Sequence, residues 1–544
     1  MTSDQQPADQ YLWWKHGVIY QIYPRSFQDA DGDGIGDLQG VIDRLDYLND
    51  GTENSLGIDA IWFSPTFPSP MADFGYDVSD YDGVHPDFGD MATMDRLIDE
   101  AHKRGIRIIL DFVPNHSSSE HPWFIESRSS QDSPKRDWYI WRDPKPEGSP
   151  PNNWIAMFGG PAWEWDQKTQ QYYLHSFLVE QPDLNWRNPD VEQAMHDVLR
   201  FWLQRGVDGF RIDVIDRILK DPQLRDNPPE PNRRWAQLFG QTALQRHVYN
   251  HNWPDIIDAT RRIRKVVDEF PERMTVGEVG GVPEQILSYY GGDSLDGLHL
   301  AFNFPFVRIW ENRWNAAHVR KSVDAFEAAA RTPGAWPNHV FGNHDVDRMI
   351  SRVNFDGHGR ERAPVAALLL LTLRGTPFIY YGEEIGMENV QIPPEHLQDP
   401  ARFYSRGRDP ERTPMQWTHD GGFTSGTPWL PYGDLSRNVQ DEAADPKSLL
   451  SLYRRIIWLR RKSGALRFGA YEAIDGLPES VYAYTRTHGD ERTLTVLNFS
   501  NDEVSFELPA PVQAAETLIG THGEPPASQR ITLAGNEGRL VRLA

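Results

Sequence analysis

The chain has 544 residues, with 55 basic and 79 acidic side chains, a net charge of −24 and no cysteine. The acidic balance argues against nucleic acid or an anionic membrane surface as a partner. The absence of cysteine excludes disulfides, thiolate metal sites and a cysteine nucleophile.

Short apolar runs alternate with amphipathic stretches along most of the chain. Runs rich in β-branched and aromatic residues predict eight strands, at residues 18–23, 60–64, 107–113, 209–215, 274–279, 298–304, 339–342 and 377–381. Apolar residues spaced three and four apart predict helices between them, at residues 91–104, 189–205, 259–269, 319–331, 363–374 and 447–461. Glycines stand where three of these helices would end, at positions 105, 206 and 375.

Eight strands alternating with helices favour a (β/α)8 barrel over an open sheet. The stretch 117–183 is rich in Pro, Ser, Trp and Asn and is too long for a loop, so we expect an inserted subdomain after the third strand. Alternating strands at 481–484, 493–499, 504–508 and 540–543 predict a C-terminal antiparallel β-sandwich. The expected domains are therefore 1–116 with 184–470, then 117–183, then 471–544.

We expect a soluble cytoplasmic protein with no membrane partner. The first ten residues lack the basic and apolar regions of a signal peptide. The longest apolar run, around residues 366–373, is far shorter than the ~20 residues that cross a bilayer.

Polar residues stand at the carboxyl ends of four predicted strands, where barrels place their catalytic groups. They are Asp111 with Asn115 and His116, Arg211 with Asp213, Glu278, and His344 with Asp345.

Arg211 and Asp213 point the same way because side chains alternate along a strand. A cation beside a carboxylate keeps that carboxylate ionised at neutral pH, as a nucleophile requires. Glu278, from the next strand, could approach the same bond from its other side. One ionised carboxylate and one protonated carboxyl form the pair that cleaves glycosides. Taken alone, Arg211 and Asp213 could equally be a structural ion pair.

These segments resemble the α-amylase family of glycoside hydrolases, glycoside hydrolase family 13. The motifs are DFVPNH at 111–116, GFRIDV at 209–214, GEV at 277–279 and FGNHD at 341–345, and QPDLN at 181–185 marks the oligo-1,6-glucosidase and α-glucosidase branch. Further matches in the family's order are GVIYQIYPRSF at 17–27, GGPAWEWD at 159–166, GTPFIYYGEEIGM at 375–387 and RDPERTPMQW at 408–417.

The resemblance assigns roles to individual residues. Asp213 matches the nucleophile, Glu278 the general acid/base, and Asp345 the third acid, which stabilises the transition state. The residues that match the binding site for the nonreducing glucose are Asp73, Tyr76, His116, Arg211 and His344. Arg412 resembles the arginine that pairs with Asp73, and Arg408 ranks below it.

Two aromatic residues and one valine bear on specificity. Phe158 and Phe177 would wall the glucose pocket or, equally, form the core of the inserted subdomain. Val214 follows the nucleophile, as in relatives that act on α-1,6 bonds. The resemblance therefore implies a retaining, exo-acting α-glucosidase for short oligosaccharides, with α-1,6 bonds favoured and α-1,4 bonds as an alternative.

An acidic loop near the N-terminus has the spacing of a cation site. Its oxygen donors would be Asp29, Asp31, Asp33, the Ile35 carbonyl and Asp37. Hard oxygen ligands suit Ca²⁺, or Mg²⁺ with waters. Gly40 stands where an EF-hand has its glutamate, so the loop resembles the single structural metal loop of this branch. The alternative is a solvated acidic turn.

A transglucosylase or isomerase of the trehalose synthase or sucrose isomerase type would share every catalytic residue. The chain lacks the RLDRD-type loop of sucrose isomerases, which lowers that alternative. A non-catalytic relative would carry a membrane anchor and an incomplete site. The oligomeric state stays open between monomer and homodimer.

Overall fold

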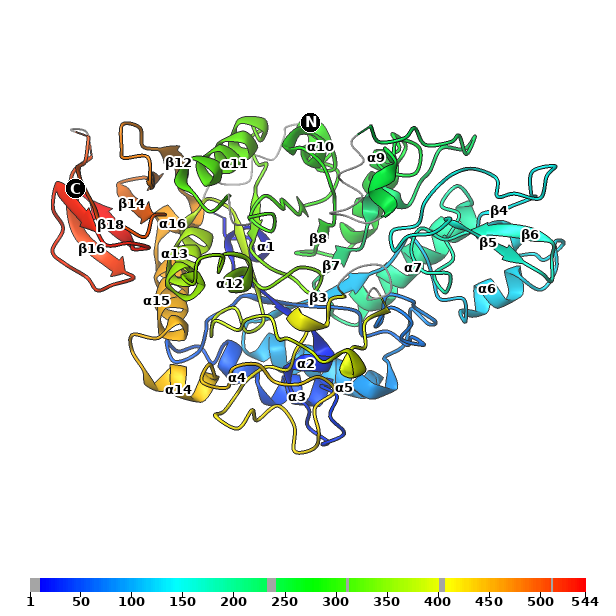
Figure 1. Ribbon diagram of the computed structural model, residues 1–544, viewed down its shortest axis with the longest axis horizontal. Coiled ribbons are helices and arrows are strands. Elements are labelled where there is room, and N and C mark those ends of the chain that lie inside the picture. The colour runs from blue at the N-terminus through cyan, green and yellow to red at the C-terminus, as the bar shows by residue number, and fades with distance from the viewer. Residues whose placement is uncertain (1–9, 232–240, 310–312, 401–406, 510–511) are drawn as a thin grey trace.

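Eight parallel strands form the central sheet of the protein (Figure 1). In this computed structural model the described residues are 10–231, 241–309, 313–400, 407–509 and 512–544. The strands are β1 (Ile19–Ile22), β2 (Ala60–Phe63), β3 (Arg107–Phe112), β7 (Gly209–Ile212), β8 (Met274–Gly277), β9 (Leu300–Ala301), β10 (Asn338–Val340) and β11 (Thr376–Tyr380). They lie in the order β10-β11-β1-β2-β3-β7-β8-β9, which confirms the expected (β/α)8 barrel.

One buried side chain joins the two ends of this sheet. Asn338 on β10 donates from Nδ2 to the Ala301 carbonyl of β9 at 3.1 Å, and its Oδ1 accepts from the Asn303 N–H at 3.0 Å. The strand predicted at 298–304 is only two residues long, because its ladder with β8 ends at Ala301. An amide side chain thus takes the place of backbone pairing between β9 and β10.

The predicted helices surround the sheet. The long ones are α5 (Met91–Lys103), α7 (Pro189–Gln204), α9 (Ile256–Val267), α11 (Ala316–Ala329), α13 (Gly359–Thr372) and α15 (Leu449–Lys462). Gly105 and Gly206 follow α5 and α7 with φ of 70° and 106°, a conformation that favours glycine. Helix α11 begins three residues earlier than predicted because Asn315 accepts from the His318 N–H and caps it.

Short helices fill the connections. They are α1 (Trp13–His16), α2 (Pro24–Phe27), α3 (Leu38–Asp43), α4 (Leu45–Leu48), α6 (Pro122–Ser127), α10 (Pro283–Ser288), α12 (Met349–Arg352), α14 (Val439–Ala444) and α16 (Gly464–Phe468). Among the described residues, no helix is both long and apolar enough to cross a membrane. The apolar run of the sequence lies in α13, which is buried on all sides because it contacts α15 and the C-terminal strands β14 and β18.

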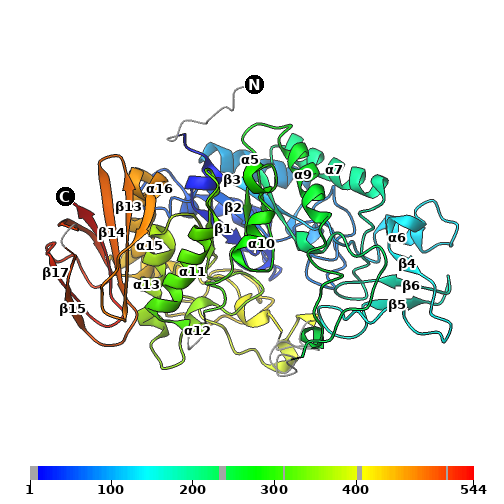
Figure 2. The same ribbon diagram turned by 90° about the horizontal axis from the view of Figure 1, so that it is seen from above.

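Two further regions lie at opposite ends of the long axis (Figure 1 and Figure 2). Between β3 and β7, an antiparallel sheet contains β4 (Trp141–Arg142), β6 (Gln171–Leu174) and β5 (Trp163–Asp166). At the C-terminus, a five-stranded sheet contains β12 (Ala470–Ala473), β13 (Val481–His488), β14 (Glu491–Asn498), β18 (Gly538–Leu543) and β16 (Ala514–Gly520). The pair β15 (Val504–Glu507) and β17 (Arg530–Leu533) shares a core with it, as expected for a sandwich.

Candidate active site

Arg211 gathers three carboxylates at the carboxyl end of the barrel. Its side chain is 1% exposed, and Nη1 donates to Asp111 Oδ1 at 2.8 Å and to Asp213 Oδ1 at 2.7 Å. Nη2 donates to Glu278 Oε2. These contacts form because β3, β7 and β8 are neighbours, with Asp111 directly opposite Arg211 in the parallel register. The predicted catalytic pair therefore shares one guanidinium.

Burial perturbs the pKa of both carboxyls of this pair. Burial raises the pKa of both Asp213 and Glu278, Arg211 opposes this shift in both, and the neighbouring carboxylates raise the values further. For Glu278 those neighbours are Asp345 and Asp216. The pair consequently retains a proton more readily than an isolated carboxyl would. One ionised and one protonated group is the state that acid-assisted nucleophilic attack needs.

A histidine network orients Tyr76. Gln21 Nε2 lies 2.8 Å from His344 Nδ1, and because the amide nitrogen is the donor, Nδ1 accepts. Burial lowers the pKa of His344 to about 3, so the ring is neutral and carries its proton on Nε2. Nε2 then donates to the Tyr76 hydroxyl at 2.6 Å, and that hydroxyl donates to Asp111 Oδ2 at 3.0 Å. The Tyr76 and His344 rings stack with an interplanar angle of 4°.

Asp73 lies on a strained turn. The two residues that follow it, Phe74 and Gly75, have φ of 45° and 103°. Asp77 stabilises this turn by accepting from the backbone N–H groups of Ala72 and Asp73, both at 2.9 Å. The turn thereby fixes the Asp73 carboxylate, which is 4% exposed.

The arginine that pairs with Asp73 is Arg408, so the predicted pairing with Arg412 is wrong. Arg408 Nη2 lies 2.6 Å from Asp73 Oδ1, Nη1 lies 3.1 Å from Asp345 Oδ1, and Asp399 receives further hydrogen bonds. Arg412 instead donates from Nε to the His344 carbonyl at 2.7 Å and from Nη2 to Asp345 Oδ1 at 3.1 Å. The two arginines contact different partners because the chain turns through a short 3-10 helix between them.

Asp345 is the most strongly ionised acid of the site. Burial acts to raise its pKa, but the guanidinium groups of Arg408 and Arg412 outweigh burial and hold the pKa below its usual range. Asp345 is therefore a fixed negative charge beside the Glu278 carboxyl. This charge favours the protonated form of Glu278.

His116 and the two predicted phenylalanines line one side of the site. The His116 ring lies 5.0 Å from the Phe177 ring, which contacts Phe158 edge to face at 6.2 Å. Arg408 in turn lies 5.4 Å from the Phe158 ring. Neither phenylalanine belongs to the buried apolar cluster of the inserted region, and both are half-buried. Of the two alternatives, the structure favours a position beside the site over one in the core of the inserted region.

Two glutamines contact the site without having been predicted. Gln181 donates from Nε2 to Asp73 Oδ2 at 3.1 Å and lies equally close to His116 Nε2. It belongs to the QPDLN motif at 181–185, which by itself indicates the branch of the family but not a contact with the site. Gln21 is a buried polar residue within the apolar strand β1, and that contrast was the available signal.

Val214 has an unusual backbone for a β-branched residue. Its φ and ψ are 34° and 45°, in the left-handed region that such side chains avoid. Its N–H faces Glu278 Oε2 at 3.5 Å. The chain therefore turns sharply directly after Asp213, at the residue whose N–H faces the Glu278 carboxyl.

The acidic loop brings together part of the predicted metal-ligand set. Oxygens of Asp29, Asp31 and Asp37 lie within 4.8 Å of one another. Asp33 is outside this group, and its Oδ1 accepts from the Ile35 N–H at 2.7 Å. Carboxylate oxygens are the donors that a hard cation such as Ca²⁺ prefers, and these three would supply part of its coordination.

Known protein families and individual proteins are similar to this chain in sequence. The family described as alpha amylase, catalytic domain, matches residues 21–469, and the maltogenic amylase, C-terminal domain, matches residues 471–537. A protein of Rhizobium meliloti (strain 1021) named probable alpha-glucosidase is 45% identical over 532 residues, covering 94% of this chain and 93% of its own. An oligo-1,6-glucosidase of Parageobacillus thermoglucosidasius is 39% identical over 571 residues, covering 98% and 99%.

Solved structures of sugar-transferring enzymes are also similar. The alpha-glucosyl transfer enzyme XgtA matches with a TM-score of 0.90 and 39% identity, covering 98% of this chain and 100% of that one. The trehalulose synthase MutB from Pseudomonas mesoacidophila MX-45 matches with a TM-score of 0.88 and 37% identity, covering 98% and 100%.

Proposed function

The chain belongs to the α-amylase family of glycoside hydrolases, and from that premise we propose that it is a retaining, exo-acting α-glucosidase for short α-glucosides. The observation that carries the proposal is the shared guanidinium of Arg211, which contacts both Asp213 and Glu278. Such a pair would bring a nucleophile and an acid from neighbouring strands to one bond. The relatives named alpha-glucosidase and oligo-1,6-glucosidase support it.

The proposed reaction is a double displacement. Arg211 occupies Asp213 Oδ1, and Oδ2 accepts no hydrogen bond from any described residue, so Oδ2 is the atom that attacks the anomeric carbon. Glu278 gives its proton to the departing glycosidic oxygen. It then removes a proton from the water that releases glucose from the covalent intermediate. Each half inverts the anomeric carbon, and the overall result is retention.

The Asp73–Arg408 ion pair supports exo action. Arg408 bridges Asp73, from the loop after β2, and Asp345, from the loop after β10, and Phe158 lies against its guanidinium. This bridge would close the pocket behind a single glucose, whose hydroxyls Asp73, Asp345 and His116 would bind. An oligosaccharide with a further sugar on the nonreducing side of that glucose would collide with the ion pair.

We further propose that α-1,6 bonds are cleaved at a rate at least comparable with α-1,4 bonds. The argument rests on Val214, whose branched side chain stands beside the nucleophile and would shape the adjoining subsite. Initial rates on isomaltose, maltose, trehalose and sucrose, with products identified, test this. Maltose hydrolysis far faster than isomaltose hydrolysis would refute the linkage preference.

Transglucosylation is the second candidate function, and the similarity to XgtA and to trehalulose synthase MutB favours it. The same covalent intermediate would then be attacked by a sugar hydroxyl instead of water. Product analysis on concentrated maltose and sucrose separates the two functions. Free glucose as the dominant product supports hydrolysis, and new disaccharides or trisaccharides support transfer.

The acidic loop is proposed to hold a structural Ca²⁺ or Mg²⁺, with Asp29, Asp31 and Asp37 as carboxylate ligands. The loop is joined to a distant segment, since the Asp29 N–H donates to the Phe423 carbonyl at 2.9 Å. A cation would neutralise the loop and thereby stabilise this junction. Its role is support of the fold rather than chemistry.

A further inference from the structure

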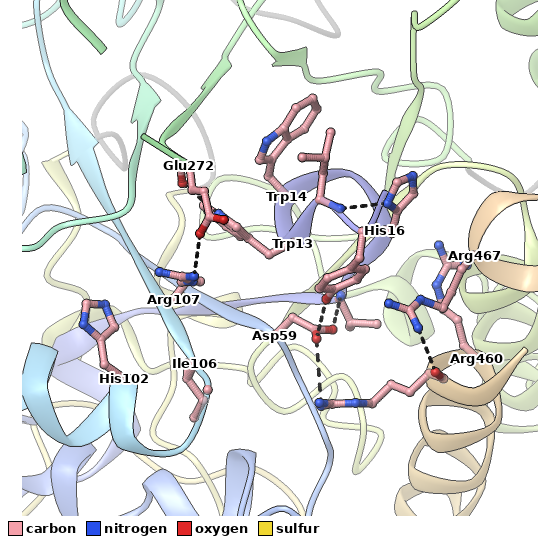
Figure 3. A pocket seen from close by; sticks show the side chains of 15 residues that line it. Trp13, Trp14, His16, Asp59, His102, Ile106, Arg107, Glu272, Arg460 and Arg467 are labelled. Atoms are coloured by element: carbon pink, nitrogen blue, oxygen red, sulfur yellow. Dashed lines mark hydrogen bonds and ion pairs between the residues drawn. The ribbon is translucent and has the colours of Figure 1, made fainter. Parts of the chain in front are cut away.

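A cavity of about 570 Å³, whose lining is drawn in Figure 3, lies at the amino ends of the barrel strands. The proposed catalytic carboxylates lie at the carboxyl ends. Its wall includes the residues just before β2 and at the start of β3, together with residues of α1, α15 and α16. We call it the basal cavity, defined by Trp13, Asp59, Arg107, Arg460, Arg461 and Arg467.

Positive charge predominates in the basal cavity although the chain carries a net charge of −24. Four arginines line it, but only two carboxylates do, Asp59 and Glu272. Arg107 is paired with Glu272 and with the buried Asp208. Of the remaining three guanidinium groups, that of Arg461 lies 3.9 Å from Asp59, at the limit of an ion pair.

Arg460 and Arg467 have no carboxylate within ion-pair distance in the described parts of the chain. Arg460 is 1% exposed, donates to backbone carbonyls of residues 371, 373 and 375, and has an Nε–H without a partner among the described residues. Among the described residues the Arg467 side chain makes one hydrogen bond, from Nη1 to the Arg461 carbonyl at 3.1 Å, and it stacks on the Tyr11 ring at 4.2 Å.

A neighbouring histidine, His16, has a lowered pKa. His16 lines the cavity, and burial lowers its pKa to about 3 with further lowering by Lys15, Arg460 and Arg467. The ring is therefore neutral and adds no positive charge. An anion in the cavity would meet guanidinium donors and the N-terminal aromatic residues together.

We propose that the basal cavity binds a phosphate monoester carried on a small sugar or nucleoside. A dianionic phosphate matches the planar fork of guanidinium donors, and the half-buried Arg467, which has no carboxylate partner among the described residues, could supply such donors. The aromatic residue Trp14 lines the same cavity and offers a flat face for the sugar or base. The volume lies within the range of about 300–1,000 Å³ that is usual for small-molecule sites.

The proposal predicts binding that is independent of the catalytic site. Isothermal titration with inorganic phosphate, glucose 6-phosphate and AMP, each in the presence of saturating glucose, measures it in the whole protein. We expect glucose 6-phosphate or AMP to bind with a stoichiometry of one and more tightly than inorganic phosphate. A preference between these two probes distinguishes a sugar phosphate from a nucleotide.

Two variants locate the binding site. Arg467→Gln removes an unpaired guanidinium and should weaken binding about tenfold or more, the loss expected for a charge-assisted hydrogen bond. Arg455→Gln is the matched control, because Arg455 lies on α15, pairs with Glu524 and does not line the cavity. Unchanged hydrolytic kcat/KM in both variants would show that the fold is intact.

Arg461→Gln provides a second test should Arg467→Gln fail to fold. No binding of any of the three probes at millimolar concentration would overturn the proposal. Equal affinity in the parent, Arg467→Gln and Arg461→Gln proteins would also overturn it, because binding would then lie elsewhere.

Discussion

Replacing Arg408 by glutamine should disable the proposed glucose pocket. Arg408 contacts three buried or half-buried carboxylates, those of Asp73, Asp345 and Asp399. Glutamine retains much of the side-chain volume but loses the charge and the fork of donors. The variant would therefore leave Asp73 with Gln181 as its remaining side-chain donor.

The magnitude follows from these contacts. A charge-assisted hydrogen bond contributes about 1.5–3 kcal/mol, and breaking a buried ion pair costs about 3–5 kcal/mol. If about 3–4 kcal/mol of this is lost from the transition state, kcat/KM falls by about two to three powers of ten. The loss should exceed that of Arg455→Gln, which removes a surface pair.

A double-mutant cycle isolates the Asp73–Arg408 interaction. Rates on p-nitrophenyl α-glucoside would be compared among the parent, Asp73→Asn, Arg408→Gln and the double variant. We expect the two losses to overlap, with a coupling energy of at least about 1.5 kcal/mol. The cycle of Asp73 with Arg412 should give a clearly smaller value, because no hydrogen bond joins them. Additivity within about 0.5 kcal/mol for Asp73 and Arg408 would refute the geometry.

Three other perturbations address the acid, the cation and the linkage. Asp216→Asn removes a carboxylate that raises the pKa of Glu278, so Glu278 should lose its proton at lower pH. The alkaline limb of the kcat/KM profile should therefore shift to lower pH, and a limb at unchanged pH would contradict this. A chelator should lower the Tm by a few degrees, and added Ca²⁺ should restore it in the parent but not in Asp31→Asn. Val214→Ala should raise the ratio of maltose to isomaltose hydrolysis, and an unchanged ratio would remove Val214 as a determinant.

The barrel and the grouping of Arg211, Asp213 and Glu278 could be predicted from the sequence because both follow from the periodicity and order of the strands. Asp213 lies two residues beyond Arg211, and alternation along a strand places both on one side. Glu278 comes from the adjacent parallel strand, so its position follows from the sheet order. Regular structure thus converts spacing in the sequence into proximity in space.

The Arg408 pairing could not be predicted in this way. Arg408 and Arg412 are four residues apart on either side of a 3-10 turn, and their directions depend on tertiary contacts with Asp399 and with the His344 carbonyl. Gln181 likewise reaches the site from the inserted region, where no regular strand carries it. The short strand β9 was overpredicted because a side chain, Asn338, provides the contact expected of backbone.

The configuration of the first product tests the central claim most directly. Proton NMR would follow the anomeric signals of glucose released from p-nitrophenyl α-glucoside before mutarotation equilibrates them. Attack by Asp213 with acid and then base assistance from Glu278 predicts that α-glucose appears first. Initial appearance of β-glucose would show a single displacement by water and would contradict the assignment of Asp213 as the nucleophile.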